Sequence, residues 1–133
     1  MKKNILFATD FSEASYASLD FINEVSNKND QVTLLHVFPD QGFSNPVPTD
    51  EELQREQLKK KKKLEAFAQK LHCKTKVTLI EGNVLGELIR YTSKHNPEVL
   101  VICRHKTGFF NRIINGDFQN LLFKHIHCPV VCC

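Results

Sequence analysis

The chain has 133 residues, of which 41% are hydrophobic and 25% are charged, and its formal net charge is +3 at pH 7. This length and apolar fraction are typical of one folded domain and exclude an intrinsically disordered chain. The longest unbroken apolar run, Val99–Cys103, is far shorter than the roughly 20 residues of a membrane-spanning helix. We therefore expect a single domain, residues 1–133, that has no membrane partner.

The basic residues are unevenly distributed along the chain. Residues 67–133 carry a net charge of +5, from nine basic and four acidic side chains, and the excess gathers around Arg104, Lys106, Arg112 and Lys124. Nucleic-acid-binding domains typically carry a stronger basic patch, so we expect no nucleic-acid partner. The opening residues lack the features of a signal peptide, and we therefore expect a cytoplasmic protein with reduced cysteines.

The first part of the chain predicts two buried strands separated by a helix. The strands are the short apolar runs Asn4–Thr9 and Gln31–Val37. Ser12 is a favourable N-cap for the intervening helix. The residues expected to face the core from that helix are apolar and recur at helical spacing: Ala14, Ala17, Phe21, Ile22 and Val25. The proline-rich segment Phe38–Pro48 then predicts a loop.

A long helix is expected to begin at Thr49 and to end near Leu71. Glu52 follows Thr49 at the spacing of a capping box. The core face of its second half is formed by Leu64, Phe67, Ala68 and Leu71. Lys59–Lys63 are five consecutive lysines that spread around the whole helix, so they cannot all face one partner. We interpret them as a solvated surface, with a polyanion-binding patch as the alternative.

The second half of the chain continues the alternation of strands and helices. The expected strands are Lys74–Ile80, Val99–Cys103 and Pro129–Cys133. A helix between the first two of these ends at Asn96 and Pro97, and a last helix opens at Asp117. The core residues expected on these two helices are apolar: Leu85, Leu88, Ile89, Leu121, Leu122 and Ile126. Arg104–Gly116 predicts a loop.

The order β-α-β-α-β-α-β-α-β predicts a three-layer α/β/α sandwich. Strands separated by helices form right-handed crossovers, and hence a parallel sheet with helices on both faces. For the five-stranded order 3-2-1-4-5, the ligand crevice lies beyond the carboxyl ends of the first and fourth strands, where the order reverses. Asp10 ends the first strand and Arg104–Gly116 follows the fourth, so we expect any ligand site there.

Several catalytic motifs are absent from the sequence. There is no phosphate-binding P-loop, dinucleotide-binding glycine motif, C-x-x-C motif or G-x-S-x-G nucleophile elbow. Asp10 resembles the nucleophile of haloacid-dehalogenase phosphatases only in strand position, because Ser12 stands where their second aspartate would be. His125, His127 and Cys128 lack the spacing of an ordered metal site. We therefore expect neither a catalytic residue nor a bound metal.

The strongest candidate for a binding site is the loop Arg104–Gly116, which ends at a helix N-terminus where free amides can hold a phosphate. Three stretches, Ile5–Ser15, Glu98–Ile102 and Gly116–Val131, resemble the universal stress protein family, in the same order along the chain. The resemblance implies an adenine nucleotide alpha hydrolase-like fold with the sheet order proposed above, and commonly a homodimer.

ATP-binding members of that family share a glycine spacing: Gly, two residues, Gly, nine residues, Gly, then Ser or Thr. Aligned at Gly116, the resemblance places Cys103 and Lys106 at the first two glycines and Asp117 at the hydroxyl position. We expect the side chains of Cys103 and Lys106 to fill space where glycine lets amides approach phosphate. An ionised Asp117 can only accept hydrogen bonds, and it would repel a phosphate by about 4 kcal/mol at 4 Å in a surface-like dielectric.

The resemblance also places Asp10 and Val37 where the family contacts adenine and ribose. On the alternative interpretation, Asp10 only anchors the turn after the strand and Val37 belongs to the core. The cationic side chain of Lys106 is long enough to contact a phosphate, so Lys106 is a candidate ligand contact together with Gly116 and Asp117. We expect no cofactor. If the chain binds nucleotides after all, ATP is the cofactor that we would expect.

We therefore interpret the chain as a regulatory binding module in stress response, dimeric, non-enzymatic and with weak or no ATP binding. The alternative is an adenine-nucleotide-binding stress switch that uses Asp10, Lys106 and the Gly116 turn. A slow ATPase is a further alternative, but no general base supports it. The apolar edge strand Pro129–Cys133 is unprotected by charge and predicts a homodimer formed by antiparallel pairing with its own copy.

Overall fold

Strands and helices alternate through residues 2–39, 46–103 and 116–133, which the computed structural model describes, with the backbone alone at 116–119. The strands are β1 (Asn4–Ala8), β2 (Gln31–Phe38), β3 (Lys74–Glu81), β4 (Val99–Ile102) and β5 (Val130–Cys132). The helices are α1 (Ala14–Val25), α2 (Asp50–Ala68), α3 (Val84–His95) and α4 (Gly116–His125). The strands form one parallel sheet in the order β3-β2-β1-β4-β5, which confirms the predicted topology.

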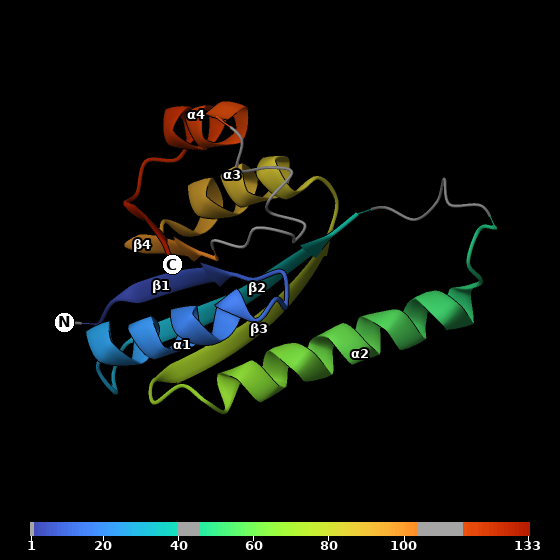
Figure 1. Ribbon diagram of the computed structural model, residues 1–133, viewed down its shortest axis with the longest axis horizontal. Helices are drawn as coiled ribbons and strands as arrows, with labels where there is room; N and C mark the ends of the chain where they lie inside the picture. The colour runs from blue at the N-terminus through green and yellow to red at the C-terminus, as the bar shows by residue number, and fades with distance from the viewer. Residues whose placement is uncertain (1, 40–45, 104–115) are drawn as a thin grey trace.

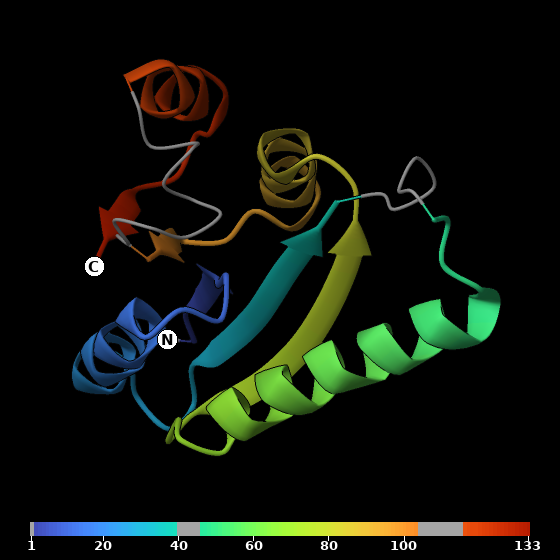
Figure 2. The same cartoon turned by 45° about the vertical axis from the view of Figure 1, so that its right-hand side comes forward.

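The sheet is covered by two helices on each face (Figures 1 and 2). Leu34 of β2 packs in the core beneath α1 and α2, whereas the next residue, Leu35, packs beneath α3 and α4. This alternation follows from the strand geometry, in which successive side chains point to opposite faces. Both leucines are fully buried, and each such burial contributes about 1.5–3 kcal/mol to stability.

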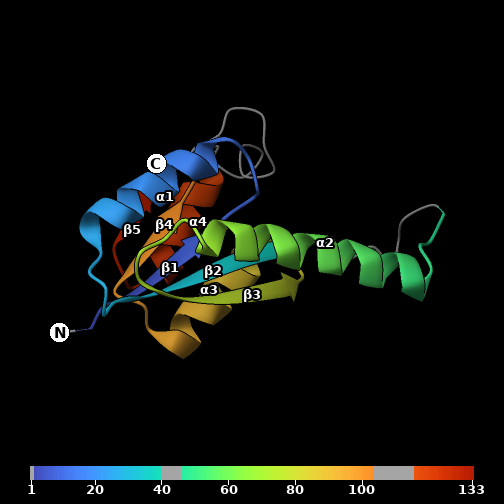
Figure 3. The same ribbon diagram turned by 90° about the horizontal axis from the view of Figure 1, so that it is seen from below.

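Helix α2 begins beyond the sheet and packs against it only through its second half (Figure 3). As predicted, Thr49 caps the helix: its side-chain oxygen accepts a hydrogen bond of 3.2 Å from the N–H of Glu52. Leu64 and Phe67 are the buried residues of the helix. The helix ends at Ala68, one turn earlier than expected, and Leu71 still reaches the core from the turn that follows.

The inward face of α1 differs from the prediction. Ser15, Ser18, Leu19 and Ile22 are buried, whereas Val25 is 42% exposed. The two serines can be buried because their hydroxyls have polar partners in the interior, described below. The prediction of Ser12 as the N-cap is also wrong, since the helix begins after Glu13 without a side-chain cap.

Helix α4 also exposes one residue that the sequence placed in the core. Leu122 and Ile126 are buried as expected, but Leu121 is 43% exposed. The helix begins at Gly116, one residue before the predicted start. None of the helices in the described ranges is long and apolar enough to span a membrane. The predicted loop Arg104–Gly116 lies outside the described residues, except for Gly116, which begins α4.

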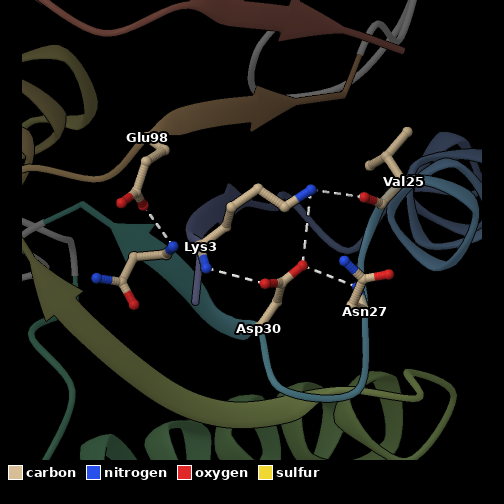
Figure 4. A network of polar contacts seen from close by, with 6 residues as sticks. Lys3, Val25, Asn27, Asp30 and Glu98 are labelled. Carbon is tan, nitrogen blue, oxygen red and sulfur yellow. Dashed lines mark hydrogen bonds and ion pairs between the residues drawn. The ribbon is translucent and has the colours of Figure 1, made fainter. Parts of the chain in front are cut away.

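The amino end of the sheet is held by a network of polar contacts (Figure 4). The buried carboxylate of Asp30 accepts hydrogen bonds from the N–H groups of Lys3 at 2.9 Å and Asn27 at 2.8 Å, and the ammonium group of Lys3 lies 3.6 Å away. The carboxylate of Glu98 accepts a hydrogen bond from the N–H of Asn4. These contacts join the start of β1 to the turn before β2 and to the start of β4.

Candidate functional site

The topology brings the end of β1 and the end of β4 together at the point where the strand order reverses. Ala8 pairs with Leu35 of β2 on one side and with Ile102 of β4 on the other. The helix that follows β1 lies on one face of the sheet and the helix that follows β4 lies on the opposite face (Figure 2). Ligands of parallel sheets bind beyond the strand ends at such a reversal. Cys103 directly follows β4 there, and Asp10 follows β1 after Thr9.

Asp10 uses one carboxylate oxygen to hold the turn after β1. Its Oδ1 accepts a hydrogen bond of 2.9 Å from the N–H of Ser12, the Asx type of turn. Phe11 between them has a positive φ of 64°, and its N–H donates to the side-chain oxygen of Thr9 at 3.0 Å. The structure therefore supports the turn-anchoring interpretation of Asp10.

The second oxygen of the Asp10 carboxylate is available to a ligand. Oδ2 is buried, and it has no hydrogen-bond partner among the residues that the structure describes. Buried polar atoms are nearly always hydrogen-bonded in native proteins, because an unpaired one loses about 1–3 kcal/mol. One oxygen of Asp10 therefore orders the turn, and the other remains the candidate contact for a ligand.

Val37 belongs to the core. It is the penultimate residue of β2, is 5% exposed, and packs with Val84 and Leu88 of α3. Its side chain points to the face of α3 and α4. This agrees with the core interpretation and leaves Val37 as a wall of the crevice at most.

Cys103 lies in a buried polar cluster beneath α1. Its Sγ is 3.2 Å from the hydroxyl of Ser15 and 3.7 Å from that of Ser18, and the hydroxyl of Ser15 is 2.7 Å from that of Thr9. The side chain of Cys103 is therefore buried beneath α1, whereas the sequence led us to expect it in the space for a phosphate. The reason is strand alternation, since Val101 and Cys103 both point toward α1.

The thiol of Cys103 is not an activated nucleophile. Burial raises its pKa, and the hydrogen bonds from Ser15 and Ser18 only partly oppose that effect. Burial likewise raises the pKa of Cys128. Reactive cysteines need a lowered pKa and an accessible sulfur, so neither of these two thiols has that character.

His36 is a site residue that the sequence reasoning missed. It alternates with Val37 and therefore points to the face of α1 and α2. Its Nδ1 lies 2.8 Å from the carbonyl oxygen of Thr9, and its ring packs against that of Phe11 with centroids 4.3 Å apart. A carbonyl oxygen only accepts, so Nδ1 carries the proton and donates it.

The pKa of His36 is lowered, chiefly because the ring is buried. The Thr9 carbonyl and the Asp10 carboxylate favour the protonated ring, whereas Lys60 and Lys63 disfavour it. The carboxylate of Asp10, which lies beyond the end of β1, and two ammonium groups of α2 therefore act on this one ring, at the carboxyl edge of the sheet.

The structure places the other predicted site residues only in part. Gly116 and Asp117 are the first two residues of α4, so the helix start that the sequence proposed as a phosphate site is present. Lys106 lies outside the described residues. Among the described residues, no three histidine, cysteine or acidic side chains are grouped as a metal site requires.

A parallel α/β/α domain whose strand order reverses between β1 and β4 is the class of protein that these elements define. The chain belongs to the universal stress protein family, whose model matches residues 1–133.

Individual relatives agree with this assignment. Universal stress protein MJ0531 of Methanocaldococcus jannaschii is 28% identical over 137 residues, which cover 97% of this chain and 80% of that protein. Among solved structures, the protein MJ0577 is similar with a TM-score of 0.77 and 23% identity, over 98% of this chain and 94% of that one. The universal stress protein from Archaeoglobus fulgidus in complex with dAMP has a TM-score of 0.69 and 17% identity, over 98% and 96%.

Proposed function

We propose that the chain is a cytoplasmic, dimeric regulatory module of stress response that binds adenine nucleotides weakly and acts by binding rather than by turnover. The observation that carries the proposal is the buried Oδ2 of Asp10, which lies at the switch point without a partner among the described residues. An acceptor in that position suits an N–H or O–H donor of an adenosine group.

The solved neighbours support a nucleotide as the ligand class. Besides the dAMP complex, they include a universal stress protein in complex with cAMP and one from Arabidopsis thaliana with AMP bound. All three cover 98% of this chain, so its fold is shared with each of them. Adenine, a pentose and one phosphate group are common to these ligands, and in the proposed function it is the adenosine part that Asp10 holds.

Weak binding is proposed because of the residues at the phosphate end. Asp117 is the second residue of α4, where the helix dipole would otherwise favour a phosphate. Its negative charge opposes a phosphate at that helix start, and it stands where ATP-binding family members carry a hydroxyl. Lys106 stands where they carry a glycine. We therefore expect the dissociation constant for ATP to lie above the micromolar range.

The dimer is proposed to form through β5. This strand lies at one edge of the sheet, and its residues Val130 and Val131 are half-buried while Cys132 is exposed. Edge strands can pair with a second copy of the chain, and such pairing would cover Val130 and Val131.

Calorimetric titration with adenosine, AMP and ATP tests the nucleotide proposal. The decisive variant is Asp10→Asn, which keeps the oxygen that holds the turn and replaces the second oxygen with a donor. We expect it to weaken adenosine binding about tenfold, by roughly 1.4 kcal/mol. The matched control is Asp20→Asn, an exposed residue of α1. Unchanged affinity in Asp10→Asn would show that the carboxylate is not the ligand contact, and micromolar ATP binding by the native chain would contradict the weak-binding proposal.

A further inference from the structure

The five consecutive lysines of α2 are not equivalent in the folded protein. Lys60 is half-buried, whereas Lys59, Lys61, Lys62 and Lys63 are exposed. Lys59 is engaged with a neighbour on its own helix, its ammonium nitrogen lying 3.5 Å from a carboxylate oxygen of Glu56. The interpretation of the whole run as a solvated surface is therefore wrong for part of it.

Two members of the run lie over aromatic rings at the carboxyl edge of the sheet. The ammonium nitrogen of Lys60 is 4.2 Å from the ring centroid of Phe38, the last residue of β2. That of Lys63 is 5.4 Å from the ring centroid of Phe11, which directly follows Asp10. Residues three apart share one face of a helix, so both cations point the same way.

These two ammonium groups lie beside the proposed adenosine site. The ring of His36 packs between those of Phe11, at 4.3 Å, and Phe38, at 6.4 Å. Both lysines act electrostatically on His36, as does the carboxylate of Asp10. One set of aromatic rings therefore connects Lys60 and Lys63 to the turn that holds Asp10.

The environment of Lys60 makes its charge effective toward an anion. Partial burial lowers its pKa, while the carboxylates of Glu56 and Glu81 favour its charged form. A cation that has lost part of its hydration interacts more strongly with a nearby negative group than a fully solvated one. An anion bound there would lie near the ammonium groups of Lys60 and Lys63 and near the uncharged imidazole ring of His36.

We propose that Lys60 and Lys63 of α2 bind the phosphate of the nucleotide whose adenosine part is held at Asp10. This inference rests on the proposed function. In this proposal, the ammonium groups of Lys60 and Lys63 bind the phosphate in place of the glycine loop that precedes α4 in ATP-binding family members. The ligand class is a nucleoside monophosphate, the class of the dAMP and AMP that solved neighbours hold.

The test compares adenosine with AMP in two double variants of the full chain. Lys60→Gln with Lys63→Gln removes the two cations over the rings, and Lys61→Gln with Lys62→Gln removes two exposed charges from the same run. Titrations are made at low salt, where such contacts are strongest. We expect the first variant to lose about tenfold in AMP affinity with adenosine affinity unchanged, and the second to match the native chain in both.

Further measurements separate a binding role from a structural one. Lys60→Arg with Lys63→Arg keeps both charges and should retain AMP binding, and thermal unfolding should show that all variants fold. Equal effects of the two glutamine variants on AMP, or a loss of adenosine affinity in the first, would overturn the inference while leaving the proposed function in place. A native chain that binds neither adenosine nor AMP would overturn both.

Discussion

The Nδ1 atom of His36 lies 2.8 Å from the carbonyl oxygen of Thr9, a contact that joins the end of β2 to the end of β1. Because the ring is buried, the folded protein resists its protonation and the pKa of His36 lies below its ordinary value of 6.5. The unfolded chain takes up this proton first as the pH falls. The stability contributed by neutral His36 is therefore complete above pH 6.5 and is lost as the pH falls from there through the lowered pKa.

This relationship predicts that His36→Gln flattens the dependence of stability on pH between 7 and 5. Urea unfolding at several pH values measures the free energy of unfolding directly. The control is His72→Gln, an exposed histidine, which should keep the slope of the native chain. An equal slope in native and His36→Gln proteins would contradict the prediction.

Replacing Cys103 should affect stability rather than ligand access. Cys103→Gly restores the family's glycine, but it removes a thiol that packs against Ser15 and Ser18. We expect a loss of about 1–3 kcal/mol in the free energy of unfolding and no gain in ATP affinity. Ser93→Ala, at an exposed position of α3, is the control and should change stability little. Tighter ATP binding by Cys103→Gly would mean that the thiol does obstruct the site.

Asp117→Ser should increase ATP affinity, alone and more so together with Lys106→Gly. The substitution removes a negative charge from the first turn of α4 and supplies a hydroxyl donor. A gain of about tenfold corresponds to roughly 1.4 kcal/mol. Asp50→Ser makes the same change in the first turn of α2, at the end of that helix that lies beyond the sheet (Figure 3). It should leave ATP affinity unchanged. No gain in the first variant would place the cause of weak binding elsewhere.

Cys132→Lys should dissociate the proposed dimer. Residue 132 is exposed in the edge strand β5, and two-fold pairing would bring two added positive charges together. Sedimentation analysis should show a monomer in place of the dimer. Thr75→Lys makes a comparable change at an exposed position of β3, the opposite edge strand, and should leave the native state of association unchanged.

Asp30→Asn should weaken the fold most at neutral pH. Hydrogen bonds from the N–H groups of Asn27 and Lys3 lower the pKa of the Asp30 carboxyl below 3.8. Its stabilising contribution is therefore complete above that ordinary value and is lost as the pH falls through the lowered pKa. The variant should melt at a lower temperature at pH 7, and the difference from the native chain should shrink under acid conditions. A difference that grows with acid would contradict this.

The sequence predicts the scaffold well because short apolar runs and helical spacing are local signals. It identifies all five strands, the sheet order and the Thr49 cap. It misses the buried face of α1, because buried serines look like surface residues until Cys103 is known to lie opposite them. The period-2 alternation of β4 does contain that information, since it aligns Cys103 with Val101.

The candidate site could be predicted only where it depends on strand ends. Asp10 could be predicted as a candidate site residue because it lies just after the first strand. The contact between Lys60 and Phe38 depends on how a helix of 19 residues docks on the sheet, and no local pattern encodes that docking. The phosphate side of the crevice could be approached only through the family resemblance, which supplies the positions of Lys106 and Asp117.

The polar network around Asp30 lies at the amino end of β1 (Figure 4), whereas Asp10 lies just beyond its carboxyl end. Because the contacts at the amino end of β1 stabilise the fold, residues at its carboxyl end can change without loss of that stability. Glycines, lysines or carboxylates can therefore be exchanged around the crevice during divergence, and a new ligand preference can arise on an architecture that remains intact.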